Sequence, residues 1–333
     1  MKTNLYWDEF AEALVTRMIQ PSKGDAFLIL ANTSTNQELA QACHAAGLRA
    51  GADTQLMIYE RIPWGEAAHF GPIILDAIRA SRLILGFHSN FLRTDAAREA
   101  LAQGTKILST EPWDMEEFLV SGFLDVNYDA MIHNGQIVAK LWDKAKECVV
   151  ISDDGTDIRF DLATRPISLD DGKLTEDGEL DYFPGVQVTI APVEETINGR
   201  IVVDTSDDVQ GILRKPYSME IENGIITDVK GGLEAIKMRR WIETRNDEKI
   251  KRLCHFTIGL NPKAQITPNL MEGERILGCV TFGFGSQPQK LDGTIGLSPY
   301  HMDVLVTSPT VYLDGEVMCD KNELNSTLGF VEI

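Results

Sequence analysis

The sequence predicts a two-part chain of class α/β plus α+β, with an N-terminal doubly wound α/β domain at 1–150 and a C-terminal β-rich domain at 151–333. In the first third, short apolar runs alternate with helical patterns, which is typical of a parallel sheet. After about residue 150 the pattern changes to closely spaced strands and tight turns. The length of 333 residues also exceeds the roughly 250–300 residues that one hydrophobic core usually serves.

The first part begins with an amphipathic helical pattern. Ser34 or Thr35 is expected to cap a helix at 38–47, and Gly47 to end it in a left-handed conformation. No glycine-rich phosphate loop follows the first apolar run, so a dinucleotide site is not expected. The predicted strands are AFLIL at 26–30, TQLMIY at 54–59 and LILGF at 83–87.

The second part follows a helical stretch at 127–147. Apolar alternation on both sides of Asp154-Gly155 predicts a β-hairpin, and a polar segment follows it. Further strand-like runs with Asn-Gly and Asp-Gly turns continue to the C-terminus. The boundary between the two parts is therefore expected near residues 150–165.

The composition excludes several classes of partner. Fifty acidic against 31 basic residues give a net charge of −19, which repels nucleic acid and anionic membrane surfaces. No apolar run approaches the roughly 20 residues of a membrane helix, and the N-terminal residues do not resemble a targeting segment. The five cysteines are scattered without CxxC spacing, as in reduced proteins. A cytoplasmic location is expected.

A metal site is predicted in the C-terminal part. His301 and Asp303 are two residues apart in a strand-like run, so both side chains should point to the same face. Together with His255, in another strand-like run, they compose the two-histidine, one-carboxylate set that suits non-haem Fe(II). HxD also occurs by chance in strands, and the histidines could be structural. Glu272 and Glu274 are either further ligands or solvated turn residues.

Several blocks in the C-terminal half resemble the aminopeptidase T family of metallopeptidases over roughly 150 residues. The blocks are PGVQVTIAPVEETINGRIVVD, HFTIGLNP, EGERILGCVTFGFG and SPYHMDVLV. The resemblance implies an N-terminal α/β domain and a β-rich metal-binding domain. In that family two metal ions are held by glutamates and histidines. Glu274 aligns with a glutamate that the family retains.

Two positions depart from the peptidase pattern. His255 stands where the peptidases have a glutamate, and Thr281 stands where they have a histidine. The altered set is similar to that of the 2,5-dihydroxypyridine 5,6-dioxygenases, which share the aminopeptidase-like fold and hold Fe(II) with two histidines and an aspartate. Their first histidine also precedes the HxD pair by several tens of residues. The resemblance therefore implies a single iron bound by His255, His301 and Asp303.

The resemblance also implies the reaction and its partners. It predicts a dioxygenase that uses Fe(II) and dioxygen to open a hydroxylated, nitrogen-containing aromatic ring, and an assembly into a homo-oligomer. LILGFHSNF followed by TKILSTEPWDMEEF is similar to the segment where the dioxygenases place a proton-handling histidine, which makes His88 the expected acid/base. Phe282, Phe284 and Tyr300 lie beside the ligand-bearing strands and are candidates for substrate contact, although they suit a core equally well.

Two other functions remain open from the sequence. A metal-dependent aminopeptidase could use Glu274 as an additional ligand and a metal-bound water as nucleophile, but Thr281 argues against it. A purely structural metal is the weakest alternative, because three ligands leave coordination positions open. The number of metal ions per chain separates the first two functions: one favours the dioxygenase and two favour the peptidase.

Overall fold

The computed structural model describes residues 3–62, 69–111, 116–162 and 164–333, and the chain divides into two compact units. Unit 1 contains Met1–Leu124 and Asp171–Gly185, and unit 2 contains Asp125–Asp170 and Val186–Ile333. These bounds differ from the expected 1–150 and 151–333. The helix at 127–147 belongs with the antiparallel sheets of unit 2. The polar segment after the first hairpin returns to unit 1, where it adds an edge strand.

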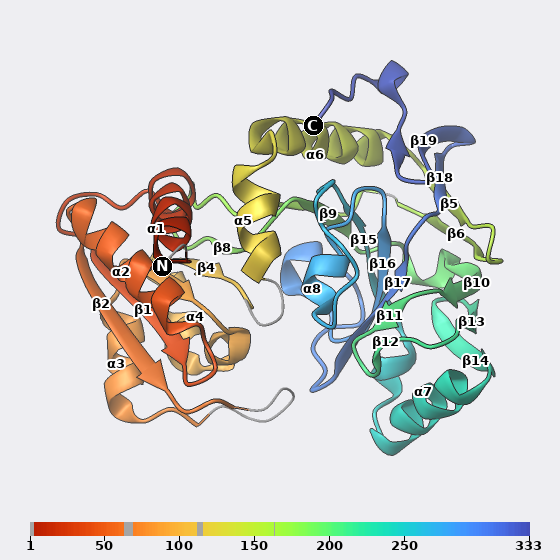
Figure 1. Cartoon of the computed structure of the whole chain (residues 1–333). Coiled ribbons are helices and arrows are strands. Elements are labelled where there is room, and N and C mark those ends of the chain that lie inside the picture. Colours follow the sequence, from red (N-terminus) through yellow and green to blue (C-terminus); the bar gives the residue numbers. More distant parts are fainter. Residues whose placement is uncertain (1–2, 63–68, 112–115, 163) are drawn as a thin grey trace. The chain divides into compact units, whose positions relative to one another are not determined.

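Unit 1 is a doubly wound α/β fold with a five-stranded parallel sheet in the order β2-β1-β3-β4-β8 (Figure 1). Apolar residues of α3 and α4 pack on one sheet face around Leu30 and Ile84. The α2 helix lies against Phe27, on the opposite face. The strands are β1 (Ala26–Asn32), β2 (Asp53–Tyr59), β3 (Leu83–Gly86), β4 (Lys106–Ser109) and β8 (Leu180–Tyr182). The helices are α1 (Thr3–Ala13), α2 (Gln37–Arg49), α3 (Pro72–Ala80), α4 (Asp95–Ala102) and α5 (Glu116–Leu124).

The ends of α2 differ from those expected. Asn36 caps the helix, because its side chain accepts hydrogen bonds from the backbone nitrogens of Glu38 and Leu39. Gly47 lies inside the helix, and the left-handed glycine that follows it is Gly51, at φ +88°. Gly47 is needed for close packing instead. A Cβ there would lie 2.5 Å from Thr54 Oγ1 and 2.8 Å from the Phe27 ring.

Gly47→Ala is therefore expected to destabilise the protein by about 1–3 kcal/mol, the usual range for overpacking a filled core. The added methyl group must push α2 away from the sheet, since both neighbours are buried. Urea unfolding followed by circular dichroism measures the change. A midpoint equal to that of the unsubstituted protein would show that the helix has room for the methyl group.

Unit 2 contains two antiparallel sheets. The eight-stranded sheet has the order β14-β13-β10-β6-β5-β18-β19-β20, and the seven-stranded sheet has the order β12-β11-β17-β16-β15-β9-β7 (Figure 1). The first sheet contains β5 (Glu147–Ile151), β6 (Asp157–Asp161), β10 (Asn198–Val203), β13 (Tyr217–Glu222), β14 (Ile225–Gly231), β18 (Thr310–Leu313), β19 (Glu316–Asp320) and β20 (Glu323–Leu324). The second contains β7 (Ile167–Asp170), β9 (Gln187–Ile190), β11 (Ser206–Asp207), β12 (Gly211–Ile212), β15 (Leu253–Gly259), β16 (Val280–Gly285) and β17 (His301–Val306). The helices are α6 (Tyr128–Lys144), α7 (Leu233–Thr244) and α8 (Leu270–Gly273).

Aromatic side chains join the two sheets of unit 2. Phe160 of β6 packs against Phe256 of β15 at 4.9 Å between ring centroids, and against Phe282 of β16 at 6.5 Å. Trp142 of α6 lies 5.2 Å from Phe256. All four side chains are buried. One face of β15 and β16 is therefore committed to the core, which leaves the other face of these strands for a site.

The β-hairpin predicted at Asp154-Gly155 is confirmed, whereas Asn198-Gly199 lies within β10 and several elements, among them β4, β8 and α7, were not predicted. Gly155, Gly224 and Gly315 have positive φ in the turns between paired strands. The helix α7 follows β14 without a predicted counterpart, and β8 is only three residues long. None of the helices in the described ranges is both long and apolar enough to cross a membrane.

Candidate metal centre

Three neighbouring strands bring His255, His301 and Asp303 to one face of the seven-stranded sheet. In the register of β15, β16 and β17, His255 pairs with Gly283, and Gly283 pairs with Asp303. His301 lies two residues before Asp303 and pairs with Gly285. Paired residues of an antiparallel sheet point to the same face, as do residues two apart in a strand. The cross-strand register therefore assembles residues that are distant in the sequence.

The donor atoms of these three side chains converge. His255 Nε2 lies 3.3 Å from His301 Nε2 and 3.2 Å from Asp303 Oδ1, and His301 Nε2 lies 3.1 Å from Asp303 Oδ2. The two imidazole rings are stacked, with centroids 5.2 Å apart. Within the described residues, buried Asp303 Oδ1 has no partner with hydrogen-bond geometry, although His255 is near. Two imidazole nitrogens and a carboxylate aimed at one point suit a divalent transition metal.

Gly283 makes room for this arrangement. It lies between His255 and Asp303 in the register, and a Cβ at this position would be 2.1 Å from His255 Nε2. A real Cβ never approaches a nitrogen so closely, so the imidazole occupies the volume that any other residue would fill. Glycine at position 283 is therefore required for the His255 imidazole to lie where it does.

The other ring nitrogen of each histidine is bound to the protein. His301 Nδ1 lies 3.0 Å from the carbonyl oxygen of Ser286, which can only accept, so Nδ1 carries the proton and donates it. His255 Nδ1 lies 3.2 Å from Thr257 Oγ1, and Thr257 Oγ1 lies 3.0 Å from Thr189 Oγ1. These contacts direct the Nε2 lone pairs of both rings towards Asp303, as a metal site requires.

Thr257→Val is expected to lower the affinity for Fe(II) about 10- to 100-fold, the usual effect of losing a hydrogen bond to a metal-bound histidine. Valine keeps the shape of the side chain but cannot accept from His255 Nδ1, so the ring is free to rotate. Competition with a chromophoric chelator measures the affinity. Thr310→Val, on β18 of the other sheet, is a matched control. Equal losses in both variants would contradict an orienting role for Thr257.

Charges around the centre favour a cation. Burial disfavours the Asp303 carboxylate, but the positive charges of His301 and His255 outweigh it and lower the pKa of Asp303. Burial, followed by the charge of Asp303, raises the pKa of Glu274 to about 7. Burial also raises the pKa of Asp208 well above its usual range, with the charges of Asp303 and Glu274 adding to the effect. Asp208 Oδ2 accepts a hydrogen bond from the backbone nitrogen of Asp303 at 3.0 Å. A bound cation would relieve this repulsion.

Cys254 offers a competing donor set. A β-bulge at Cys254 interrupts the pairing of β15 with β16, and donor atoms of Cys254, His255 and His301 lie within 4.8 Å of one another. The sulfur approaches His301 at Nδ1, at 3.8 Å, which is the nitrogen that Ser286 engages. Burial is also the main cause that raises the pKa of the Cys254 thiol, and a neutral thiol is a poor ligand. The set with Asp303 therefore fits a metal better.

Glu274 and the three aromatic candidates for substrate contact have different surroundings. Arg275 Nη1 donates to Glu274 Oε2 at 2.6 Å, which makes Glu274 a partner of a buried guanidinium. Phe282 and Phe284 are fully buried and alternate with Gly283, so they face the core and not the histidines. The prediction that they contact the substrate is wrong, because side chains alternate along a strand and both rings lie on the face opposite to the histidines. Tyr300 is partly exposed, with Arg245 5.3 Å from its ring centroid.

His88 lies in unit 1, directly after β3. It is buried, and its Nε2 lies 3.4 Å from Thr35 Oγ1. Its side chain does not cap the short 3-10 helix Ser89–Arg93 that follows. The segment TKILSTEPWDMEEF, used with His88 in the resemblance, lies partly outside the described residues, since 112–115 are not described.

Three further histidines lie outside the metal centre. His44 lies in α2 and His133 in α6, and His44 Nε2 is 3.1 Å from the carbonyl oxygen of Thr54. His69 precedes α3 and is exposed.

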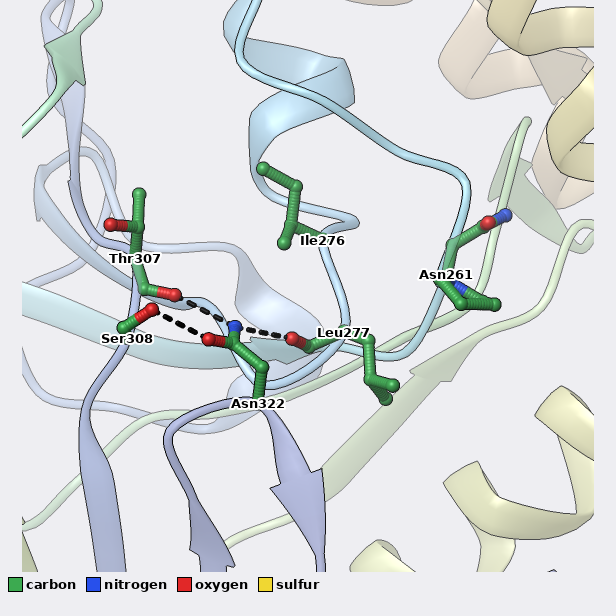
Figure 2. Close-up of a pocket in the computed structure, with 7 residues that line it drawn as sticks. Asn261, Ile276, Leu277, Thr307, Ser308 and Asn322 are labelled. Atoms are coloured by element: carbon green, nitrogen blue, oxygen red, sulfur yellow. Dashed lines mark hydrogen bonds between the residues drawn. The ribbon is translucent and has the colours of Figure 1, made fainter. Parts of the chain in front are cut away.

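A pocket of about 310 Å³ also lies in unit 2, and none of the residues that line it is a candidate metal ligand. Figure 2 shows that its polar groups bind one another: Asn322 Nδ2 donates to the carbonyl oxygens of Leu277 and Thr307, and Ser308 Oγ donates to Asn322 Oδ1. Few groups are left for a ligand, so this pocket is not the candidate centre.

Sequence reasoning missed three residues of the centre: Gly283, Thr257 and Asp208. The spacing of Thr257, two residues after His255 in one strand, would have placed it on the same face. Gly283 gave no such signal, because its role depends on the pairing of β16 with β15. Asp208 gave none either, because its role depends on a hydrogen bond from the distant backbone nitrogen of Asp303.

Comparisons with known proteins identify the family of the chain. Residues 7–326 match the family model described as NicX, 2,5-dihydroxypyridine 5,6-dioxygenase. A curated 2,5-dihydroxypyridine 5,6-dioxygenase from Pseudomonas putida is 27% identical over 188 residues, and the match spans about half of each chain, 54% of both.

Two solved structures share the fold. The structure of 2,5-dihydroxypyridine dioxygenase from Pseudomonas putida KT2440 superposes with a TM-score of 0.79 at 20% identity, covering 97% of this chain and 98% of that one. Wild-type AmpT from Thermus thermophilus superposes with a TM-score of 0.69 at 15% identity, covering 96% and 99%. The predicted aminopeptidase T-like fold is confirmed. Because the family model covers nearly the whole length, the chain belongs to the 2,5-dihydroxypyridine 5,6-dioxygenase family.

Proposed function

We propose that this protein is a mononuclear Fe(II) dioxygenase of the extradiol type, which opens a hydroxylated N-heteroaromatic ring such as 2,5-dihydroxypyridine. The observation that carries the proposal is the convergence of His255 Nε2, His301 Nε2 and the Asp303 carboxylate on one face of a sheet. Three such ligands on one side leave coordination positions open for substrate and dioxygen. Family membership supports the same reaction.

In this proposal the three side chains hold the metal, the Ser286 carbonyl fixes the tautomer of His301, and the Thr257 hydroxyl accepts from Nδ1 of His255 and orients its ring. Bound Fe(II) would supply the electrons that let dioxygen react with a closed-shell ring. His88 is the proposed acid/base, which takes a proton from a ring hydroxyl at an imidazole nitrogen. The homo-oligomer and the cytoplasmic location expected from the sequence stay predictions.

A metal-dependent aminopeptidase is the second candidate, and the similarity to AmpT and the partly buried Glu274 favour it. It would need Glu274 as a metal ligand, yet Arg275 already binds Glu274 Oε2. Thr281, on the same face as Gly283, replaces a histidine of the peptidase pattern. The two candidates differ in the number of metal ions that they require.

The test is anaerobic reconstitution with Fe(II), followed by metal counting and by oxygen uptake with 2,5-dihydroxypyridine. One iron per chain, with oxygen uptake that His301→Ala abolishes, is the expected result. Two bound ions, no oxygen uptake and cleavage of aminoacyl substrates would assign the protein to the peptidases instead.

The protonation of His88 gives a prediction that needs no substrate. Burial, with a smaller contribution from the charge of Arg61, lowers the pKa of His88 from 6.5 to about 4, so the imidazole is neutral at pH 7. As pH falls below 6.5, the His88 imidazole is protonated in the unfolded chain, whereas in the folded chain it is protonated only near pH 4. Stability that is present above pH 6.5 is therefore lost as pH falls through this window.

We expect His88→Gln to lose less stability between pH 7 and pH 4.5 than the unsubstituted protein, because glutamine does not titrate. Urea unfolding at both pH values measures the difference, and the histidine NMR signals report the pKa directly. His133→Gln, on an exposed part of α6, is the matched control. An imidazole of His88 that titrates near pH 6.5 would contradict the prediction.

A further inference from the structure

The carboxyl ends of the strands in unit 1 carry a second group of polar side chains. In the sheet order β2-β1-β3-β4-β8, the strands β2 and β3 lie on opposite sides of β1. The strand order reverses between β1 and β3. In open α/β sheets, small ligands bind outside the carboxyl ends of the strands at this point. Thr35 and His88, which follow β1 and β3, meet here at 3.4 Å.

Four polar residues lie at or just after the ends of four adjacent strands, and we call them the polar row. Asn32 pairs with Tyr59 in the register of β1 and β2. Leu30 pairs with Gly86, and Gly86 with Ser109, and His88 and Glu111 follow these last paired residues of β3 and β4 by two positions each, as Asn32 follows Leu30. The polar row consists of Tyr59 (7% exposed), Asn32 (1%), His88 (8%) and Glu111 (9%).

Two donors of the polar row lack partners with hydrogen-bond geometry in the described part of the chain. Asn32 Oδ1 accepts from the backbone nitrogen of Ser34 at 2.8 Å and from Ser34 Oγ at 2.7 Å, which fixes the amide orientation and turns Nδ2 away. Asn32 Nδ2 and Tyr59 Oη are buried and have no partner with hydrogen-bond geometry among these residues, although the Asn32 side chain is near enough to Tyr59 to lower the pKa of the phenol. Ser109 Oγ is also buried without such a partner. An unpaired buried group of this kind destabilises the folded chain. A ligand that accepts from them would remove that cost.

The charges around the polar row define the ligand. Burial, and next the charge of Glu111, raises the pKa of Tyr59 to about 12, so the phenol keeps its proton and can donate. Glu111 accepts from the backbone nitrogen of Ser89 at 3.2 Å and also from its hydroxyl. Arg61 is exposed and its charge reaches His88. An anionic ligand would meet the Glu111 carboxylate, whereas an uncharged ligand with an accepting oxygen would not.

We propose that the polar row binds an uncharged cyclic amide or hydroxylated N-heteroaromatic ring, with Tyr59 Oη and Asn32 Nδ2 donating hydrogen bonds to its oxygen. The choice of ring rests on the proposed function, but the site itself is built from residues of unit 1 and needs no metal. In this proposal Tyr59 and Asn32 bind the ligand, in addition to the residues of the metal centre. Thr110, although buried and unpartnered as well, directly follows Ser109, the last residue of β4, and is therefore expected to face the other side of the sheet.

The test is calorimetric titration of the full, metal-free chain with 2-pyridone, a cyclic amide that lacks the second hydroxyl group of a dihydroxypyridine. Saturable binding is expected, and Tyr59→Phe and Asn32→Asp should each weaken it roughly 3- to 10-fold, the effect of one lost hydrogen bond. Asn32→Asp keeps the oxygen that accepts from Ser34 but replaces the donor by an acceptor. Tyr312→Phe, on β18 of unit 2, is the matched control and should bind as the unsubstituted protein does.

Absence of saturable binding would overturn the proposal, and so would equal affinities in all three variants. Tighter binding of formate than of 2-pyridone, weakened by the same two variants, would replace the uncharged ligand by an anion and also overturn it. His301→Ala separates this result from the proposed function. It should lose Fe(II) and oxygen uptake but still bind 2-pyridone, whereas Tyr59→Phe should still bind one iron per chain.

Discussion

Asp303→Asn is expected to lower the affinity for Fe(II) by more than about 100-fold and to abolish oxygen uptake with 2,5-dihydroxypyridine. Asparagine has nearly the same shape but removes the carboxylate that both imidazoles contact. The loss should exceed the 10- to 100-fold that is usual for a residue that only orients a ligand. Metal content after reconstitution and chelator competition give the affinity.

The matched control is Asp153→Asn, an exposed aspartate that pairs with Lys321. It removes the same charge at the surface and should leave iron binding unchanged. Circular dichroism checks that Asp303→Asn is folded, because in the metal-free chain Asp303 also forms ion pairs with the two histidines. An Asp303→Asn protein that binds one Fe(II) as tightly as the unsubstituted protein would remove Asp303 from the ligand set.

The local sequence pattern was sufficient for elements that depend on near neighbours. The strand period places His301 and Asp303 on one face, and Asp154-Gly155 marks the turn between β5 and β6. The same pattern, applied to Phe282 and Phe284, should have put them on the opposite face from Gly283. Both residues are close in sequence to the ligand-bearing strands, but the face of the strand decides what a side chain contacts.

Other features depend on contacts that the sequence does not state. Gly47 looks like a helix terminator, but its role is to let α2 approach Thr54 and Phe27. The strand β8 joins a parallel sheet some 70 residues after β4, and a three-residue strand gives almost no periodic signal. The pairing of His255 with Gly283 depends on the register of β15, which a bulge shifts by one residue.

The bulge pairs His255 with Gly283, which makes Gly283 a second position where a substitution should strongly weaken Fe(II) binding. Gly283→Ala is expected to lower the affinity for Fe(II) by more than about 100-fold, although it changes no ligand. The new Cβ would lie 2.1 Å from His255 Nε2 and 2.5 Å from the adjacent ring carbons, so the imidazole must leave its position. Gly283 has no left-handed φ, so alanine itself introduces no backbone strain there. The effect should come from the displaced ring.

A double-mutant cycle distinguishes this steric mechanism from a general loss of structure. In a His255→Ala background the imidazole is absent, so Gly283→Ala should cause little further loss of metal affinity. Gly47→Ala serves as a control for overpacking elsewhere: it should lower the urea midpoint and leave the iron affinity unchanged. If instead Gly283→Ala lowers the affinity equally with and without His255, the alanine acts through the fold of β16, and the open position in the strand is not what seats the imidazole.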